Sequence, residues 1–362
     1  MSKFKQTWQK IGPVLFVILV ILLLLVPAVQ WYFPERHLVT NSTLFQLTQM
    51  FMLITLASNW NLTGGFTGYI DFGHAVFFGI GAYGTGIFMQ QMGINASMLK
   101  DGFSIAILPI LGGAVVAAIF ALGIGSATLR LRGPYFSISM LGTFYAMREI
   151  IRVTKPITGG GEGLMLPPFL DRELFYYITL LLAVFVILMI WWIRRSEFGA
   201  SLVAIREDEI GAEMRGINTT LHKITAFMIA AFFGGIIGGL WAIQNTFIDP
   251  DIVFFESRTV DLVMMTMLGG LGTVAGPVVG VTVLYWLREV IWANFLDWHL
   301  AVQGALLIVI VLFVPEGIMG ILGDPNSTSL GRLWKRMTQG SEITDAYDEA
   351  ESIHKMSEEV TS

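Results

Sequence analysis

Residues 174–218 read LFYYITLLLAVFVILMIWWIRRSEFGASLVAIREDEIGAEMRGIN. The first 20 of them, Leu174–Ile193, carry no charged side chain and are long enough to cross a bilayer as one helix. The next polar stretch, Ser196–Asn218, holds seven charged residues in a chain that is otherwise poor in charge: Glu197, Arg206, Glu207, Asp208, Glu209, Glu213 and Arg215. This change predicts a membrane-spanning helix that leads directly into a polar segment at the membrane surface.

The composition of the whole chain is typical of a membrane protein. Of its 362 residues, 54% are hydrophobic and 14% are charged, and the mean hydropathy is +0.68. Soluble domains carry about 25% charged residues, and several apolar runs here reach the ~18 residues of a transmembrane helix. We therefore expect an all-α polytopic membrane protein. The absence of cysteine excludes disulfides, thiolate metal sites and thiol nucleophiles.

Hydropathy predicts about ten transmembrane helices, some of them short or broken by glycine. The expected spans are 14–33, 43–62, a third that ends near 89, 103–129, 134–153, 174–193, 224–243, 260–268, 277–292 and 300–313. The alternative for the first is a cleaved signal peptide with small residues near Ala28, but its apolar run is longer than that of a typical signal sequence.

The basic residues orient these spans. An even number of crossings puts both termini on one side, and basic residues accumulate on the cytoplasmic side of membrane proteins. Most basic clusters fall together on that side (Lys3, Lys5, Lys10, Arg130, Arg132, Arg194, Arg195), whereas Arg148, Arg152 and Lys155 fall on the other, against the trend. We expect both termini in the cytoplasm.

Two parts of the chain differ in composition. Residues 1–322 are expected to form one transmembrane domain. From Asp324 onward there are eight acidic and four basic residues and little apolar periodicity. Residues 323–362 are therefore expected to be an acidic, largely disordered cytoplasmic tail.

Plotted as a helix, the charged stretch 196–218 is amphipathic. An apolar sector of about 60° (Val203, Ile210, Met214, Ile217) lies beside a charged stripe (Arg206, Glu209, Glu213). Gly216 is the expected end of this helix. Such a helix suits a partner surface that is part apolar and part charged. The alternative is an ordinary solvated helix that lies on the membrane.

A glycine-rich stretch, Gly64–Gly86, is expected to break the chain between the second and third spans, and it contains Asp71 and His74. Polar groups at membrane depth are costly and often line a transport pathway. Asp71, His74, Phe77 and Tyr83 are therefore candidates for a translocation path. The alternatives are that Asp71 caps the following helix and that the aromatic side chains pack in the core.

Two further glycine-rich stretches bear on the packing. Residues 234–239 hold two overlapping GxxxG pairs, which predict a close helix–helix contact. A break at 269–276 gives the second half of the chain an interruption as well, and paired interruptions of this kind occur around the central pathway of transporters.

No pattern typical of catalysis or metal binding is found. The five histidines are scattered, no zinc-ligand spacing or Ser/His/Asp arrangement stands out, and Gly159–Gly163 lacks the lysine of a P-loop. We expect no catalytic residue, metal or cofactor in the chain, and the net charge of −5 gives no reason to expect a nucleic-acid partner. An ion-driven secondary transporter would need buried ionisable residues, for which Asp71, Glu149 and Asp261 are the few candidates.

Three motifs, in this order, resemble those of branched-chain amino-acid ABC importer permeases. They are residues 61–83 (NLTGGFTGYIDFGHAVFFGIGAY), residues 131–136 (LRGPYF), and residues 196–199 (SEFG) followed by 204–209 (AIREDE) and 216–218 (GIN). The resemblance is greatest to the LivM-type subunits and covers residues 40–322.

The resemblance implies that the charged stretch is the coupling loop, which docks on an ATPase subunit. The expected coupling residues are Arg206, Glu207, Asp208, Glu209, Glu213 and Gly216. The general importer pattern there is EAAxxxG. Gly211, Ala212 and Gly216 match it, but Ile210 stands where the first glutamate would be.

The resemblance further implies a permease subunit that brings branched-chain or related amino acids into the bacterial cytoplasm across the inner membrane. Its implied partners are a second related permease, two ATPase subunits that bind ATP and Mg²⁺, a periplasmic binding protein, and membrane lipid. The outer loops Thr154–Arg172 and Asn245–Arg258 are the expected docking surfaces. Importers of urea and short amides use similar subunits and are the alternative for the cargo.

Overall fold

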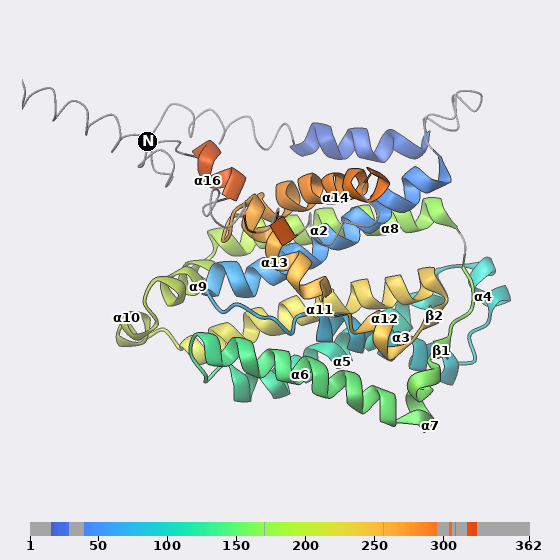
Figure 1. Ribbon diagram of the computed structural model, residues 1–362, viewed down its shortest axis with the longest axis horizontal. Helices are drawn as coiled ribbons and strands as arrows, with labels where there is room; N and C mark the ends of the chain where they lie inside the picture. The colour runs from blue at the N-terminus through green and yellow to red at the C-terminus, as the bar shows by residue number, and fades with distance from the viewer. Residues whose placement is uncertain are drawn as a thin grey trace, which may run out of the picture.

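The computed structural model describes residues 16–28, 40–169, 171–255, 257–294, 304–305, 308 and 317–323, and this part is almost entirely helical (Figure 1). Its longer helices are Phe16–Ala28, α2 (Asn41–Thr67), α3 (Ala75–Gln91), α5 (Ser104–Thr128), α6 (Pro134–Val153), α8 (Arg172–Arg195), α9 (Glu197–Glu207), α11 (Thr219–Asn245), α13 (Ser257–Gly269) and α14 (Gly276–Asn294). The short elements are α4 (Ala96–Asp101), α7 (Lys155–Thr158), η2 (Gly160–Glu162), β1 (Leu164–Met165), α10 (Glu209–Met214), β2 (Phe247–Ile248), α12 (Pro250–Val253) and α16 (Gly317–Gly323).

Each predicted span up to the ninth coincides with a helix. By length and hydropathy, three of the described helices, α5, α8 and α11, are long and apolar enough to cross a membrane. The predicted tenth span lies almost entirely outside the described residues, and so does the acidic tail after Gly323.

The centre of the bundle is formed by α3, α5 and α11, which pack closely on one another. The GxxxG pairs of α11 lie in this contact, as the sequence predicts. A Cβ atom at Gly235 would come within 2.8 Å of the Ala114 Cα in α5, and one at Gly238 within 2.0 Å of the Phe78 carbonyl oxygen in α3. Glycine at these two positions therefore sets the separation of the three helices. Close van der Waals packing of small residues is what associates helices in lipid.

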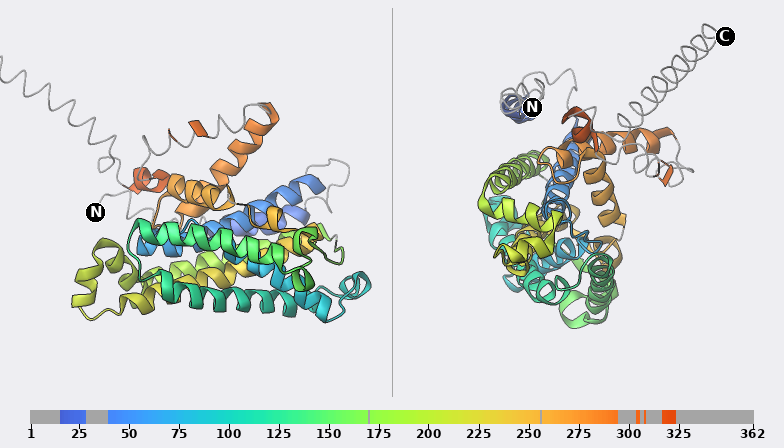
Figure 2. Two further views of the ribbon diagram at one scale, coloured as in Figure 1. Left: turned by 60° about the horizontal axis from the view of Figure 1, so that its bottom comes forward. Right: turned by 90° about the vertical axis from the view of Figure 1, so that its left-hand side faces the viewer.

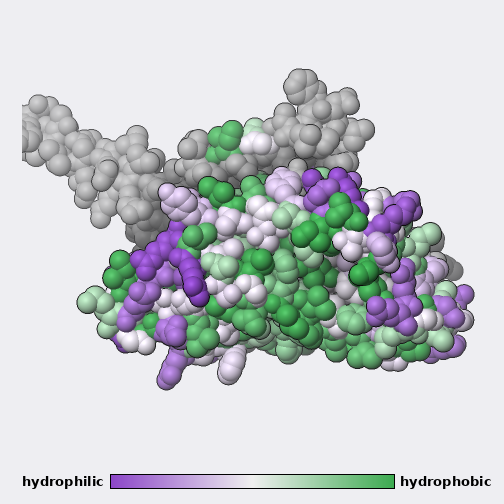
Figure 3. Space-filling view, turned by 90° about the horizontal axis from the view of Figure 1, so that it is seen from below, coloured by the Kyte–Doolittle hydropathy of each residue, from purple (hydrophilic) through white to green (hydrophobic). Residues whose placement is uncertain are grey.

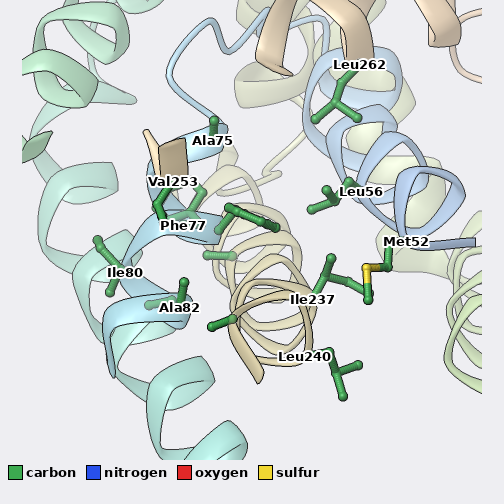
Figure 4. Close-up of a cluster of buried hydrophobic side chains, with 14 of the residues drawn as sticks. Met52, Leu56, Ala75, Phe77, Ile80, Ala82, Ile237, Leu240, Val253 and Leu262 are labelled. Carbon is green, nitrogen blue, oxygen red and sulfur yellow. The ribbon is translucent and has the colours of Figure 1, made fainter. Parts of the chain in front are cut away.

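Side chains of α2 complete the core beside α11. Met52 and Leu56 of α2 lie next to Ile237 of α11, and Phe77 of α3 lies on the other side of α11 (Figure 4). All four are buried. The far side of α2 packs against α8, so α2 is enclosed by protein along much of its length.

The predicted break between the second and third spans is a non-helical segment, residues 68–74, which runs along the middle of the bundle between α2 and α3 (Figure 1). It is called the extended segment, although its last residues, 72–74, form a turn. Gly68 ends α2 in the left-handed conformation (φ 77°). Successive residues of the segment then alternate: Tyr69, Asp71 and Gly73 are buried, whereas Ile70 and Phe72 are exposed. One edge of the segment thus faces the protein interior and the other faces outward.

Side chains replace the helical hydrogen bonds that this segment lacks. Trp60 Nε1 donates to the Asp71 carbonyl oxygen (2.8 Å), and Ser137 Oγ donates to the Ile70 carbonyl oxygen (2.6 Å). Thr259 Oγ1 accepts from the Ala75 amide (3.1 Å) at the start of α3. Non-helical backbone inside a membrane protein requires such partners, because no water is available to supply them.

The two ends of the bundle are polar and its flank is apolar. Seen from below, hydrophilic residues gather at both ends and a band of hydrophobic residues separates them (Figure 3). The α9 and α10 helices lie at one end, and α4, α7, β1 and β2 lie at the opposite end (Figure 1). A hydrocarbon core of about 30 Å requires an apolar belt of this kind.

Candidate functional site

The charged stretch Ser196–Asn218 forms two helices at one end of the bundle rather than the predicted single helix. α9 begins after Ser196, whose Oγ accepts a hydrogen bond from the Gly199 amide (3.3 Å), and ends at Glu207. Asp208 is extended (φ −157°, ψ 103°), and α10 begins after it. Aspartate is a weak helix former because its side chain competes for backbone groups. The predicted continuous helix is wrong for this reason.

The end of α10 is as the sequence predicts. Gly216 adopts the left-handed conformation (φ 85°), and the Ile217 amide donates to the Ala212 carbonyl oxygen (3.1 Å). This is the glycine-terminated helix end that satisfies the last carbonyl groups. Viewed from this end, α9 and α10 lie across the bundle in front of the long helices (Figure 2).

Arg206, the last basic residue of α9, ties this helix to α2. Its Nη1 donates to the Gly65 carbonyl oxygen (3.0 Å), and its Nη2 donates to Glu207 Oε1 (2.7 Å). A Cβ atom at Gly272 would collide with the same Nη1. Asn61 of α2 also binds the break at residues 269–276. Its side-chain amide donates to the Thr273 carbonyl oxygen (2.8 Å) and accepts from the Gly272 amide (2.9 Å). The end of α2 and the 269–276 break therefore meet at Arg206.

Glu209, the first residue of α10, enters a polar cluster with Tyr69 and Lys223. Lys223 Nζ donates to Glu209 Oε1 (2.7 Å), to Tyr69 Oη (2.9 Å) and to the Leu129 carbonyl oxygen (2.8 Å). Tyr69 Oη donates to Glu209 Oε2 (2.5 Å). Arg132 Nε lies 3.9 Å from the same carboxylate. The cluster joins α10 to α11, to the extended segment and to the α5–α6 loop.

Two acidic groups of this cluster have shifted pKa values. Burial raises the pKa of Glu209, but the hydrogen bonds from Lys223 and Tyr69 and the charge of Lys223 outweigh it, and the pKa lies below that of an ordinary glutamate. Burial, and then the hydrogen bond to Glu209, raise the pKa of the Tyr69 phenol above its ordinary value. At neutral pH the carboxylate is therefore ionised and the phenol keeps its proton as a donor.

Ile210, Glu213 and Met214 of α10 face outward, whereas Ala212 is buried. Ile210 and Met214 are 57% and 85% exposed. Glu207, Asp208 and Glu213 are exposed beside them, and Glu213 also accepts a hydrogen bond from Thr219 (2.9 Å). The predicted coupling residues therefore divide into two groups. Arg206 and Glu209 hold the segment to the bundle, and the other side chains form a surface that is part apolar and part acidic.

The structure brings Asp71 and His74 together in the buried turn before α3. His74 Nδ1 lies 3.1 Å from Asp71 Oδ2, and both side chains are shielded from solvent. Asp71 Oδ1 accepts from the Gly73 amide (2.8 Å), so it closes this turn. The alternative that Asp71 caps α3 is wrong, because the helix begins after His74 and no side chain caps it.

Phe77 and Tyr83 lie on α3 and are also buried. The Phe77 ring packs edge-on against Phe227 (centroids 4.9 Å apart), which agrees with core packing. Tyr83 stacks on Phe254 (6.2 Å). Its hydroxyl group is buried without a hydrogen-bond partner among the described residues.

Within the described ranges, no three His, Cys, Asp or Glu side chains are grouped so that they could hold a metal ion.

Residues 42–311 match the family described as branched-chain amino acid transport system / permease component. The chain belongs to this permease family.

Three relatives of this permease are named for branched-chain amino acid transport. The high-affinity transport system permease protein LivM of Escherichia coli (strain K12) is 30% identical over 328 residues, which cover 82% of this chain and 73% of the relative. LivM of Salmonella typhimurium is 29% identical over 333 residues (83% and 74%). The permease protein LivH of Escherichia coli (strain K12) is 25% identical over 304 residues (76% and 96%). No solved structure matches the chain.

The two predicted outer loops of the permease meet at the end opposite α9 and α10. β1 and β2 pair antiparallel, with Leu164 opposite Ile248. Arg152 contacts Asp251, and Lys155 Nζ lies 2.6 Å from Glu162 Oε1. Two of the basic residues that oppose the positive-inside trend are therefore paired with acidic residues.

Sequence reasoning about the permease missed Tyr69 and Lys223. A signal for Lys223 was present, because it is the one Lys, Arg, Asp or Glu in the sequence of α11. A lone charge at the start of an apolar span needs a partner. Nothing in the sequence, however, identified Glu209 as that partner.

Proposed function

We propose that the protein is the transmembrane permease subunit of an ATP-binding-cassette importer that moves branched-chain or related amino acids into the cytoplasm. The observation that carries this proposal is the α9–α10 segment: it lies outside the bundle, is fixed to it by Arg206 and Glu209, and exposes Ile210 and Met214. The names of the relatives support the cargo.

In the proposed assembly the chain lies in the bacterial inner membrane with about ten spans and with both termini in the cytoplasm. Residues 1–322 form the permease domain, and residues 323–362 form a cytoplasmic tail. The chain pairs with a second, related permease and with two ATPase subunits, which hold ATP and Mg²⁺. A periplasmic binding protein delivers the cargo to the end formed by β1, β2 and α7.

The α9–α10 segment is the proposed coupling element. Glu207, Asp208 and Glu213 set the orientation of the ATPase subunit, Ile210 and Met214 supply apolar contact area, and Gly216 ends the helix at the contact. Charged groups at the edge of an interface chiefly give specificity and register, whereas buried apolar side chains give affinity. Arg206 and Glu209 act on the other side of the segment.

The contacts of Arg206 and Glu209 would transmit a movement of the ATPase subunit to the transmembrane helices. A segment held by a buried ion pair moves with its partners as a rigid body, whereas a flexible loop would absorb the displacement. Arg206 contacts Gly65 at the end of α2 and lies against Gly272. A displacement of α9 would therefore act at once on the end of α2, where the segment 68–74 begins, and on the break at residues 269–276.

The proposed translocation path runs along the outward edge of the extended segment. Ile70 and Phe72 on that edge are 40% and 39% exposed. Non-helical backbone is tolerated at membrane depth where it is covered by protein or lines an aqueous cavity, not where it faces lipid. Asp71 and His74, with Phe77 and Tyr83 behind them, form the wall that holds this edge in place.

The test uses the absence of cysteine. Met214→Cys places one thiol on α10, and Met165→Cys places one on β1 with similar exposure (85% and 77% for the two methionines). The tagged chain is expressed with candidate ATPase and second permease subunits from the same genome, purified in mild detergent and treated with a short bifunctional cross-linker. We expect the ATPase to co-purify and to cross-link to position 214 but not to position 165. Absence of the ATPase, or equal cross-linking at both positions, contradicts the proposal.

A further inference from the structure

A cavity of about 400 Å³ lies among α2, α3, α11, α13 and α14, away from the α9–α10 segment. One wall is apolar and includes Met52, Leu53 and Ile237. Three charged side chains, those of Arg258, Arg288 and Glu289, also line the cavity. The volume is within the range of small-molecule sites, and a largely apolar lining with a few convergent polar groups is typical of them.

Arg258 lines this cavity and carries a hydrogen-bond donor that no described residue binds. Its guanidinium carbon lies 3.9 Å from the centroid of the Phe78 ring and 5.2 Å from that of Trp241. Its Nη1 is buried and has no hydrogen-bond partner among the described residues. A buried donor without an acceptor is destabilising. A carboxylate is the group whose shape and charge fit a planar guanidinium.

The other charged groups near the cavity already have partners. Arg288 Nη1 donates to Asp261 Oδ2 (2.8 Å), and Glu289 Oε1 accepts from Gln46 Nε2 (2.8 Å). In and beside the cavity there are thus two guanidinium groups, of Arg258 and Arg288, and two carboxylates, of Asp261 and Glu289. These charges cancel, so a ligand with net charge gains little, whereas a ligand that carries both charges finds a partner for each. Among the described residues only Gln46 binds the Glu289 carboxylate, through Oε1, which leaves Oε2 for an ammonium group.

We propose that this cavity is a transit site for a free zwitterionic amino acid with an apolar side chain. Arg258 binds its α-carboxylate, Glu289 binds its α-ammonium group, and the wall of Met52, Leu53 and Ile237 contacts its side chain. This inference rests on the proposed function, and it adds a cargo-binding site inside the membrane domain.

The experiment uses photo-leucine, a leucine analogue with a diazirine in its side chain, on the assembled importer in detergent. Labelled peptides are mapped by mass spectrometry after illumination. We expect the label on the segments of α2 and α11 that line the cavity. Leucine should compete with it, whereas 4-methylpentanoate, which lacks the ammonium group, and 3-methylbutylamine, which lacks the carboxylate, should not.

Two variants test the residues, and one serves as a control. Arg258→Gln should reduce labelling about tenfold or more, as expected for the loss of a charge-assisted hydrogen bond. Leu53→Trp should have the same effect, because it fills the cavity and keeps the guanidinium. The control is Arg195→Gln, since Arg195 also lies 3.9 Å from an aromatic centroid, that of Trp191, but is not part of the cavity.

Unchanged labelling in both variants, or a label that maps outside the cavity, overturns the inference. ATP-driven leucine uptake is measured on proteoliposomes made from the same preparations. If the unmodified complex takes up leucine and Arg258→Gln does not alter uptake or labelling, the transit site is wrong and the proposed function stands. If the unmodified complex shows neither uptake nor a bound ATPase, the proposed function fails, and the labelling pattern still decides whether the cavity binds the amino acid.

Discussion

The Lys223 ammonium group of α11 lies 2.7 Å from Glu209 Oε1 of α10, and the two side chains are only 2% and 15% exposed. The pair joins a helix outside the bundle to one that runs through it. Tyr69 completes the connection, because it donates to the same carboxylate from the extended segment that follows α2. The only described polar side chains that bind the Lys223 ammonium group are thus Glu209 and Tyr69.

Lys223→Met should destabilise the folded protein by about 2–3 kcal/mol, because it removes the charged donor of the Glu209 carboxylate, which keeps only Tyr69, and the donor of the Leu129 carbonyl oxygen. This is slightly less than the ~3–5 kcal/mol cost of breaking a fully buried ion pair, since Glu209 retains some access to water and the hydrogen bond from Tyr69. Unfolding by denaturant in detergent, followed by circular dichroism, measures it. Lys155→Met is the control, because the Lys155–Glu162 pair is 67% and 77% exposed and should contribute less than about 1 kcal/mol. Equal effects of the two substitutions would show that the buried pair does not stabilise the fold.

Acid should weaken the same contact. The pKa of Glu209 is lowered in the folded state. Its contribution is therefore fully present above its unfolded pKa, near the ordinary 4.5, and is lost as the pH falls through the folded value. Glu209→Gln should be less stable than the unmodified protein at neutral pH, and the difference should shrink below about pH 4.5. Unfolding temperatures of both proteins over this pH range test the prediction, which is refuted if the difference stays constant or grows in acid.

Local signals in the sequence located most of the helices. Apolar runs of the right length marked the spans up to the ninth, and the glycines at 234–239 marked the tight contact of α11. These properties depend on near neighbours along the chain. The break at Asp208 was missed, because the amphipathic pattern of residues 203–217 continues through it while the backbone does not.

The candidate site could be predicted only in part, because its key contacts join residues far apart in sequence. Glu209 was predicted as a coupling residue from its place in the charged stretch, and the structure shows that its carboxylate binds Lys223 and Tyr69. A lysine at position 209 would place a second ammonium group beside Lys223. Hydrophobic periodicity reports which face of a helix is apolar. It does not report which distant side chain will meet a given charge.

Gly238→Ala should destabilise the bundle, and Gly123→Ala should not. The new Cβ at position 238 would come within 2.0 Å of the Phe78 carbonyl oxygen, whereas at residue 123 it would have no described atom within 4 Å other than those of the adjoining α5 backbone. The first substitution forces α3 and α11 apart, at a cost of about 1–3 kcal/mol. The second should be neutral or should stabilise by up to about 1 kcal/mol, because alanine favours the helix over glycine. Thermal unfolding of both variants in one detergent provides the comparison, and a loss of similar size at both positions would contradict the role given to Gly238.

Met214→Glu should abolish binding of the ATPase and amino-acid uptake while leaving the fold unchanged. Met214 is 85% exposed, so a glutamate there can extend into solvent, and it adds a negative charge beside Glu207, Asp208 and Glu213. Desolvating that charge at an apolar contact would weaken binding by several kcal/mol, which is at least about a hundredfold in affinity. Gly216→Arg probes the same surface, although the left-handed backbone at this position adds about 1–2 kcal/mol of strain. Co-purification of the ATPase, uptake and unfolding temperature are measured together. Full uptake by both variants would mean that the ATPase does not bind at α10, and a lowered unfolding temperature for Met214→Glu would mean that its side chain packs within the permease.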